Sequence, residues 1–189
     1  ATYIQEEVLD SFLDAVYDQH AEQEQSDLRV VYTPLNGTGL ECVTRILERI
    51  GVTDIHVVEE QSKPDGNFPT CPYPNPEIRE ALECGIALCE QVHPDLLLAT
   101  DPDADRVGIA VKDGDDYQLL SGNEVGVLLL DFICRMRKEN GTLPEHPVAV
   151  TTIVSTSLVD PVAAKYGVDM RLSLIHISEP TRLRCISYA

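Results

Sequence analysis

Short apolar runs alternate with amphipathic segments along most of this chain, and this alternation limits its fold more than any other feature. From Leu28 onward, runs typical of buried strands are followed by segments whose apolar residues recur every three or four positions, as on a helix. The predicted strands are residues 28–32, 55–58, 96–99, 107–111, 117–120 and 147–154, and the predicted helices are residues 40–50, 76–89, 124–138 and 157–166. Alternating strands and helices predict an α/β fold, with mixed, largely parallel sheets layered with helices.

The pattern of residues 4–16 predicts one further helix, at the start of the chain. Ile4, Val8, Phe12 and Val16 recur at every fourth position, so we expect an amphipathic helix that turns its acidic side to the solvent. The stretch that follows, residues 21–27, has the composition of a polar linker.

Composition excludes several classes of partner. The chain carries 14 Lys and Arg against 32 Asp and Glu, a formal net charge of −18, which argues against nucleic acid or an anionic membrane surface as a partner. No apolar stretch approaches the ~20 residues that span a bilayer.

The 6 cysteines form no C-x-x-C pair, so we expect reduced, buried thiols in a cytoplasmic protein.

The strongest candidate site is an acidic loop, residues 101–106, which follows a predicted strand. It places Asp101, Asp103 and Asp105 at alternate positions and ends with Arg106. In a regular strand such carboxylates would stand about 6.6 Å apart, and on a helix positions i and i+2 do not face each other. Only a tight loop brings the three carboxylates to one ion. Oxygen ligands without His or Cys favour Mg²⁺ or Ca²⁺, so the loop predicts a divalent cation site.

The acidic loop has two other interpretations. Asp and Pro are good turn formers, so the segment could simply end the strand. A calcium-binding EF-hand also opens with three alternating acidic positions, but it requires Gly at position six and Glu at position twelve. Those positions hold Arg106 and Lys112, which excludes the EF-hand.

Two further loops stand out. The glycine turn, residues 33–39, leads from a strand into a helix, and Gly37 and Gly39 permit close backbone approach. Exposed N–H groups at the start of that helix would suit an anion, although a plain tight turn explains the glycines equally well. The proline-rich loop, residues 64–76, is stiff, and long irregular loops are often functional. Because the glycine turn and the acidic loop both follow strand carboxyl ends, we expect them to share one edge of the sheet.

Four segments, in this order, resemble the motifs of a known family. They are Tyr-Thr-Pro-Leu-Asn-Gly-Thr-Gly (32–39), Pro-Asp-Gly-Asn-Phe-Pro (64–69), Pro-Asn-Pro-Glu (74–77) and Asp-Pro-Asp-Ala-Asp-Arg (101–106). The set resembles the α-D-phosphohexomutases, in particular their bacterial phosphoglucomutase/phosphomannomutase branch.

The resemblance implies a protein of four domains, of which this chain holds a part. Residues 1–113 would be the second, metal-binding domain, and residues 114–171 the incomplete third. Asp101, Asp103 and Asp105 match the family's Mg²⁺ ligands, and Arg106 matches an arginine that contacts the phosphate on the active serine. The family's phosphoserine, sugar-recognition and phosphate-binding loops have no counterpart here.

The resemblance therefore implies a fragment of an enzyme that moves a phosphoryl group between positions 1 and 6 of a hexose phosphate, through a phosphoserine and Mg²⁺. The fragment alone is expected to be inactive. A non-catalytic Mg²⁺-binding fragment and a different cation-dependent phosphotransferase are the alternatives. Residues 172–189 match neither the family nor the charge balance and resemble a translated sequencing adapter, so we expect a non-native tail there.

Overall fold

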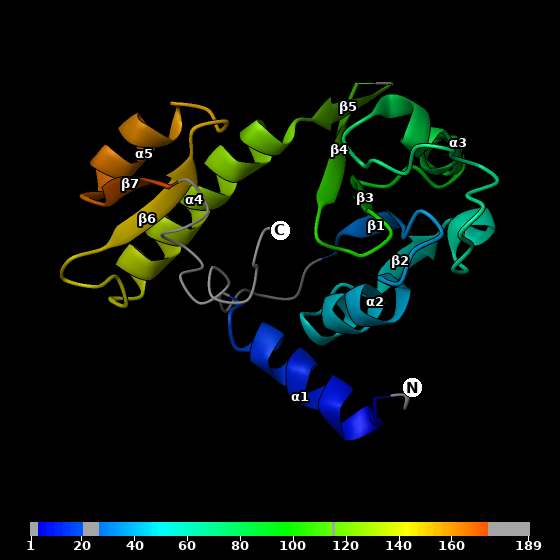
Figure 1. Cartoon of the computed structure of the whole chain (residues 1–189), viewed down its shortest axis with the longest axis horizontal. Helices are drawn as coiled ribbons and strands as arrows, with labels where there is room; N and C mark the ends of the chain where they lie inside the picture. Colours follow the sequence, from blue (N-terminus) through cyan, green and yellow to red (C-terminus); the bar gives the residue numbers. More distant parts are fainter. Residues whose placement is uncertain (1–3, 21–26, 115, 174–189) are drawn as a thin grey trace, which may run out of the picture. The chain divides into compact units, whose positions relative to one another are not determined.

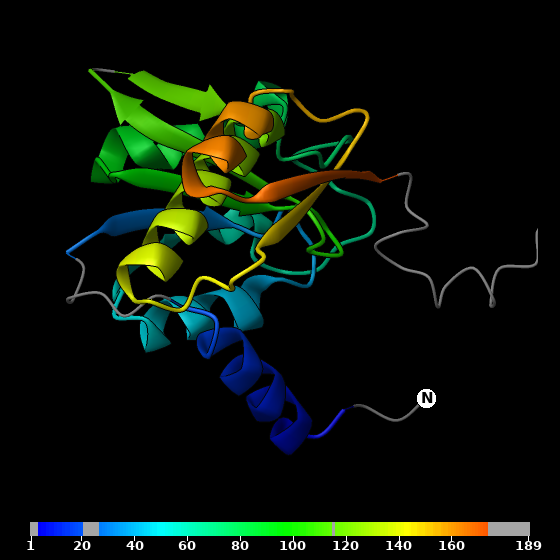
Figure 2. The same ribbon diagram turned by 90° about the vertical axis from the view of Figure 1, so that its left-hand side faces the viewer.

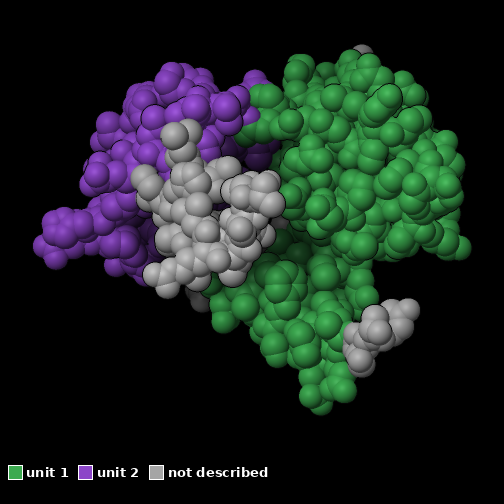
Figure 3. Space-filling view, viewed as in Figure 1, with its two compact units in different colours: residues 1–122 green, residues 123–189 purple. Residues whose placement is uncertain are grey.

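The computed structural model describes residues 4–20, 27–114 and 116–173. The chain divides into two compact units, residues 1–122 and residues 123–189, which Figure 3 draws in different colours. Residues 21–26 of the linker predicted over residues 21–27 lie outside the described residues.

The first unit is built around one five-stranded sheet (Figure 1) with the order β2-β1-β3-β4-β5. The strands are β1 (Arg29–Thr33), β2 (Asp54–Val57), β3 (Leu96–Thr100), β4 (Val107–Asp113) and β5 (Asp116–Leu120). β1 pairs in parallel with β2 and β3, whereas β4 runs antiparallel to both β3 and β5. The mixed α/β fold predicted from the sequence is confirmed, and β4 and β5 form a hairpin.

Helices α2 (Leu40–Arg49) and α3 (Glu83–Val92) connect the first three strands of this unit. α2 follows β1, and α3 precedes β3 and packs against it and against β1. A Cβ atom at Gly85 of α3 would lie 2.8 Å from Cδ1 of Leu97, so glycine allows the helix to approach the sheet closely. The core beneath α3 consists of Val31, Val58, Leu82, Cys89, Leu97, Ala99, Ala110 and Tyr117.

The helix expected over residues 76–89 begins later than predicted. Ile78 is extended, with φ −108° and ψ 138°, and a 3₁₀ helix, η2 (Arg79–Leu82), leads into α3. A second 3₁₀ helix, η1 (Glu59–Gln61), follows β2. The prolines of the preceding loop fix extended or turn backbone, which delays the start of regular helix.

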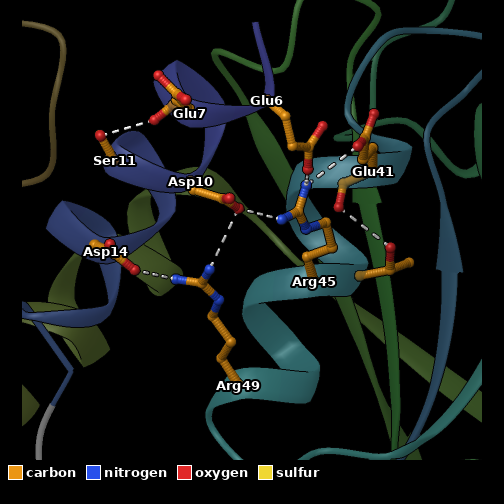
Figure 4. Close-up of polar contacts among 9 residues, drawn as sticks. Glu6, Glu7, Asp10, Ser11, Asp14, Glu41, Arg45 and Arg49 are labelled. Atoms are coloured by element: carbon orange, nitrogen blue, oxygen red, sulfur yellow. Dashed lines mark hydrogen bonds and ion pairs between the residues drawn. The ribbon is translucent and has the colours of Figure 1, made fainter.

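The orientation predicted for the N-terminal helix, α1 (Glu6–Tyr17), is wrong. Its acidic side faces α2, where Glu6, Asp10 and Asp14 pair with Arg45 and Arg49, as Figure 4 shows. Arg45 Nη1 lies 2.7 Å from Glu6 Oε1, and Arg49 Nη1 lies 2.6 Å from Asp14 Oδ1.

As a consequence, the apolar positions of α1 are solvent-exposed. Ile4 is 73% exposed, Val8 56% and Phe12 54%, while Leu13 is buried. The acidic residues recur at every fourth position just as the apolar ones do, so the helix has two stripes. Periodicity alone does not tell which of them meets a neighbour; the two arginines of α2 decide it.

The second unit contains a parallel two-stranded sheet, visible in Figure 2. β6 (Val148–Thr152) and β7 (Asp169–Ser173) are joined by α5 (Val159–Tyr166), and α4 (Gly122–Glu139) packs beside them through the cluster of Cys134, Ala163 and Val168. β7 includes Leu172 and Ser173, which the sequence assigned to the tail, and Ser173 is only 1% exposed. The rest of that segment, residues 174–189, lies outside the described residues.

The five cysteines in the described ranges are all free thiols. Cys71, Cys89 and Cys134 are buried, and Cys42 and Cys84 are half-buried. Among the described helices, none is long and apolar enough to cross a membrane.

Replacement of the buried Tyr32 by Phe should make the free energy of unfolding decrease less steeply as the pH rises into the alkaline range. Burial raises the pKa of Tyr32 to about 12, above the value of about 10 in an unfolded chain. Stability from this shift is therefore present below about pH 10 and is lost as the pH rises towards 12. Urea unfolding at pH 9.5 and 11.5 should show a smaller decrease for Tyr32→Phe, by up to ~1.4 kcal/mol per pH unit. Tyr73→Phe, at a residue 79% exposed, should keep the wild-type slope; equal slopes in all three proteins would contradict this account.

Candidate metal centre

The acidic loop follows β3 directly at the carboxyl end of that strand. Carboxylate oxygens of Asp101, Asp103 and Asp105 all lie within 4.8 Å of one another. Asp101 is 1% exposed, and the other two are at the surface. The loop is closed by backbone hydrogen bonds from Asp101 N to Arg106 O (3.3 Å) and from Ala104 N to Asp101 O (3.0 Å). The structure therefore brings together the three side chains that the sequence nominated as metal ligands.

Arg106 lies against the buried member of this group. Its backbone N–H donates to Asp101 Oδ1 (3.0 Å) and its Nε donates to Asp101 Oδ2 (2.8 Å), while Nε also lies 3.6 Å from Asp105 Oδ1. A carboxylate oxygen has two lone pairs, so each Asp101 oxygen can still bind a cation. The Arg106 side chain is half exposed, and its terminal Nη atoms have no partner among the described residues.

The electrostatics of the loop favour a further positive charge. Burial raises the pKa of Asp101, but the two hydrogen bonds from Arg106 outweigh it, and the net pKa lies below the ordinary value. The charge of Asp103 raises the pKa of Asp105, and the nearby Asp101 adds to this shift. Three negative charges thus stand against the single positive charge of Arg106, and an additional cation would relieve their repulsion.

The glycine turn lies against the acidic loop, as predicted, but it offers no anion site at three of its N–H groups. Those of Asn36, Gly37 and Thr38 donate to the carbonyl oxygens of Gln61, Pro34 and Pro102, respectively. Neighbouring backbone therefore occupies these three donors, whereas the anion site was predicted at the N–H groups of the helix start, and α2 begins only at Leu40.

The proline-rich loop forms another wall of the centre. Tyr73, Pro74 and Asn75 line a cavity of about 490 Å³ together with four residues of the acidic loop, namely Asp101, Pro102, Asp103 and Arg106. A Cβ atom at Gly108, just after the acidic loop, would lie 2.0 Å from the Pro76 carbonyl oxygen. Glycine at this position is what allows the proline-rich loop to reach the start of β4.

Sequence reasoning missed the residue that ties these loops together, Gln61. Its side chain is fully buried, accepts a hydrogen bond from Thr33 Oγ1 (2.6 Å) and donates one to Thr70 Oγ1 (3.1 Å). Asn36 adds to the same network by donating to the Lys63 carbonyl oxygen (2.9 Å). Gln61 lies in a polar stretch without periodicity, so no local sequence pattern indicates that its side chain is buried.

Residues 10–114 match the model of a known protein family, described as "Phosphoglucomutase/phosphomannomutase, alpha/beta/alpha domain II". The chain belongs to the phosphoglucomutase/phosphomannomutase family, which confirms the resemblance seen in its motifs. A phosphoglucomutase of Staphylococcus haemolyticus is 34% identical over 184 residues, which cover 95% of this chain and 33% of that protein. The chain thus spans about a third of the length of this relative.

Solved structures agree on the fold. A phosphoglucomutase/phosphomannomutase family protein from Burkholderia thailandensis superposes with a TM-score of 0.69 at 21% identity, over 92% of this chain and 35% of that one. An N-acetylphosphoglucosamine mutase from Aspergillus fumigatus, in complex with glucose 1,6-bisphosphate, gives a TM-score of 0.55 at 16% identity, over 85% of this chain and 30% of that one. At these identities the likeness concerns the fold alone.

Replacing Ala104 with Gly should stabilise the protein. Ala104 adopts a left-handed conformation, with φ 58°, which costs a residue with a Cβ about 1–2 kcal/mol. Glycine removes that strain, and its greater freedom when unfolded returns part of the gain, so we expect about 0.5–1 kcal/mol of net stabilisation. Ala87→Gly, at an exposed position within α3, is the matched control and should destabilise by about 1 kcal/mol. Urea unfolding that showed equal losses for both variants would contradict a strained Ala104.

Proposed function

We propose that this chain is the metal-binding part of a phosphohexomutase, which moves a phosphoryl group between positions 1 and 6 of a hexose phosphate by way of a phosphoserine and Mg²⁺. The proposal is supported above all by one observation, the three carboxylates within 4.8 Å of one another beside Arg106. Membership of the phosphoglucomutase/phosphomannomutase family supports the class of reaction.

The donor set fits Mg²⁺. Asp101, Asp103 and Asp105 supply only carboxylate oxygens, which Mg²⁺ prefers, and the cluster contains no His or Cys that would favour zinc. These three residues would hold the ion. When bound there, Mg²⁺ would polarise a phosphoryl oxygen and neutralise charge that develops during transfer.

Arg106 would bind the phosphate beside the cation. Its Nε is used by Asp101, so its orientation is set, while the terminal Nη donors point to no other described residue. A guanidinium held in this way can donate two hydrogen bonds to one phosphoryl group. The wall formed by Tyr73, Pro74 and Asn75 would limit access of solvent to that phosphate.

The remaining parts of the assignment are also proposals. Residues 1–113 would be the second domain and residues 114–171 the opening of the third; the structural division falls between Gly122 and Asn123, after the β4–β5 hairpin. The substrate would be a sugar phosphate, the chemistry present in the complex of the Aspergillus fumigatus mutase. The free thiols of the five cysteines in the described ranges support a cytoplasmic location.

Isothermal titration of the chain with Mg²⁺ tests the metal centre directly. Asp103→Asn removes one charged ligand and should weaken binding by about tenfold or more, since even residues behind a metal ligand contribute 10- to 100-fold. Asp113→Asn, which removes the same charge from an exposed position at the end of β4, is the control and should bind as the wild type does. Identical titrations for Asp103→Asn and the wild type would count against the acidic loop as the site.

Turnover tests the assignment as a mutase. The chain alone should not convert glucose 1-phosphate, because it spans a third of its relative. A chimera in which residues 10–114 replace the matching segment of the Staphylococcus haemolyticus phosphoglucomutase should convert it, and Asp103→Asn in the chimera should reduce the rate at least about tenfold. Undiminished turnover by that variant, or conversion by this chain alone, would overturn the proposal.

A further inference from the structure

The backbone of the acidic loop is held by a residue from a different loop, Thr38 of the glycine turn. The carbonyl oxygen of Pro102, which stands between Asp101 and Asp103, accepts two hydrogen bonds from this one residue. Thr38 N donates at 2.9 Å and Thr38 Oγ1 donates at 3.1 Å. A single threonine therefore provides both donors to that carbonyl group.

The neighbouring Gly37 makes this contact possible. A Cβ atom at Gly37 would lie 2.3 Å from the Pro102 Cα atom and 2.5 Å from its carbonyl oxygen. Because these are backbone atoms, they have no flexible end that would move aside. The glycine turn and the acidic loop thus touch backbone to backbone, and any larger residue at position 37 would separate them.

The same turn also contacts the residue before Asp101. The hydroxyl groups of Thr100 and Tyr32 are hydrogen-bonded at 2.9 Å in the protein interior. A Cβ atom at Gly39 would lie 2.7 Å from each of these two oxygens. Asp101 is therefore flanked on both sides by residues that pack directly against the glycine turn.

Such support matters because two of the three ligand side chains lie at the surface. Asp103 and Asp105 are exposed and repel each other and Asp101, so in the absence of a cation the loop experiences a force that separates them. A site that is already in its binding geometry pays less ordering entropy when the ion arrives.

We propose that Thr38 is a positioning residue of the metal centre, whose hydroxyl holds the Pro102 carbonyl group so that the three aspartates stay gathered for the cation. The proposal rests on the proposed function of the acidic loop as a metal site. It assigns the glycine turn a role in metal affinity.

Binding of Mn²⁺, a paramagnetic substitute for Mg²⁺, tests this role by electron paramagnetic resonance of the free ion. Thr38→Val keeps the shape and the backbone donor but removes the hydroxyl, and it should weaken Mn²⁺ binding by about 3- to 10-fold, the value of one hydrogen bond. Thr38→Ser restores the hydroxyl and should bind within about twofold of the wild type.

The matched control is Thr44→Val in α2, which removes a hydroxyl that likewise donates to a backbone carbonyl group, that of Leu40, at 2.8 Å. Thr44→Val should leave Mn²⁺ affinity unchanged, and urea unfolding of all variants would show whether any change in affinity merely follows stability. Wild-type affinity in Thr38→Val, or equal weakening in Thr38→Ser and Thr38→Val, would overturn the positioning role. Failure of the wild-type chain itself to bind Mn²⁺ would refute the metal centre, and the inference with it.

Discussion

The mutual repulsion of Asp101, Asp103 and Asp105 is the constraint that the loops around the candidate metal centre must oppose. Three carboxylates whose oxygens lie within 4.8 Å of one another separate unless the surrounding structure opposes them. Arg106 neutralises the buried one, and pairing of β3 with β4 fixes both ends of the loop. Backbone pairing and one arginine together hold a charge cluster that side-chain packing alone would not hold.

The centre is assembled from three loops that are distant in the sequence and adjacent in the fold. The acidic loop supplies the carboxylates, the glycine turn contacts its backbone, and the proline-rich loop lines the cavity. Glycine at positions 37 and 108 permits two of the contacts, since a Cβ atom at either would collide with the backbone of Pro102 or Pro76. The buried side chain of Gln61 links the glycine turn to the proline-rich loop. These neutral contacts are as much a part of the centre as its charged residues.

Local patterns of apolar residues predicted most of the helices and strands. They failed where one element carries two stripes of side chains, either of which could pack against a neighbour. The strand that ends at Thr33 was recognisable because it lies between β2 and β3 and is buried from Val30 onward, where apolar residues dominate it. In contrast, α1 carries an acidic and an apolar stripe of the same period, and its partner helix selected the acidic one through Arg45 and Arg49. Gln61 gave no signal either, because a polar residue in a polar stretch looks the same whether it is buried or solvated.

By itself, the sequence determined the alternation of strands and helices and the presence of three alternate carboxylates after a buried strand, because both depend on residues close together along the chain. The family also follows from the sequence, through the order and spacing of its motifs. Only the tertiary structure decided what surrounds those carboxylates: that Arg106 neutralises Asp101, that Thr38 donates to Pro102, and that three N–H groups of the glycine turn are already occupied. The reason is that each of these contacts forms where loops meet at one edge of a sheet. Strand order and register determine which backbone groups meet there, and a short stretch of sequence does not determine either of them.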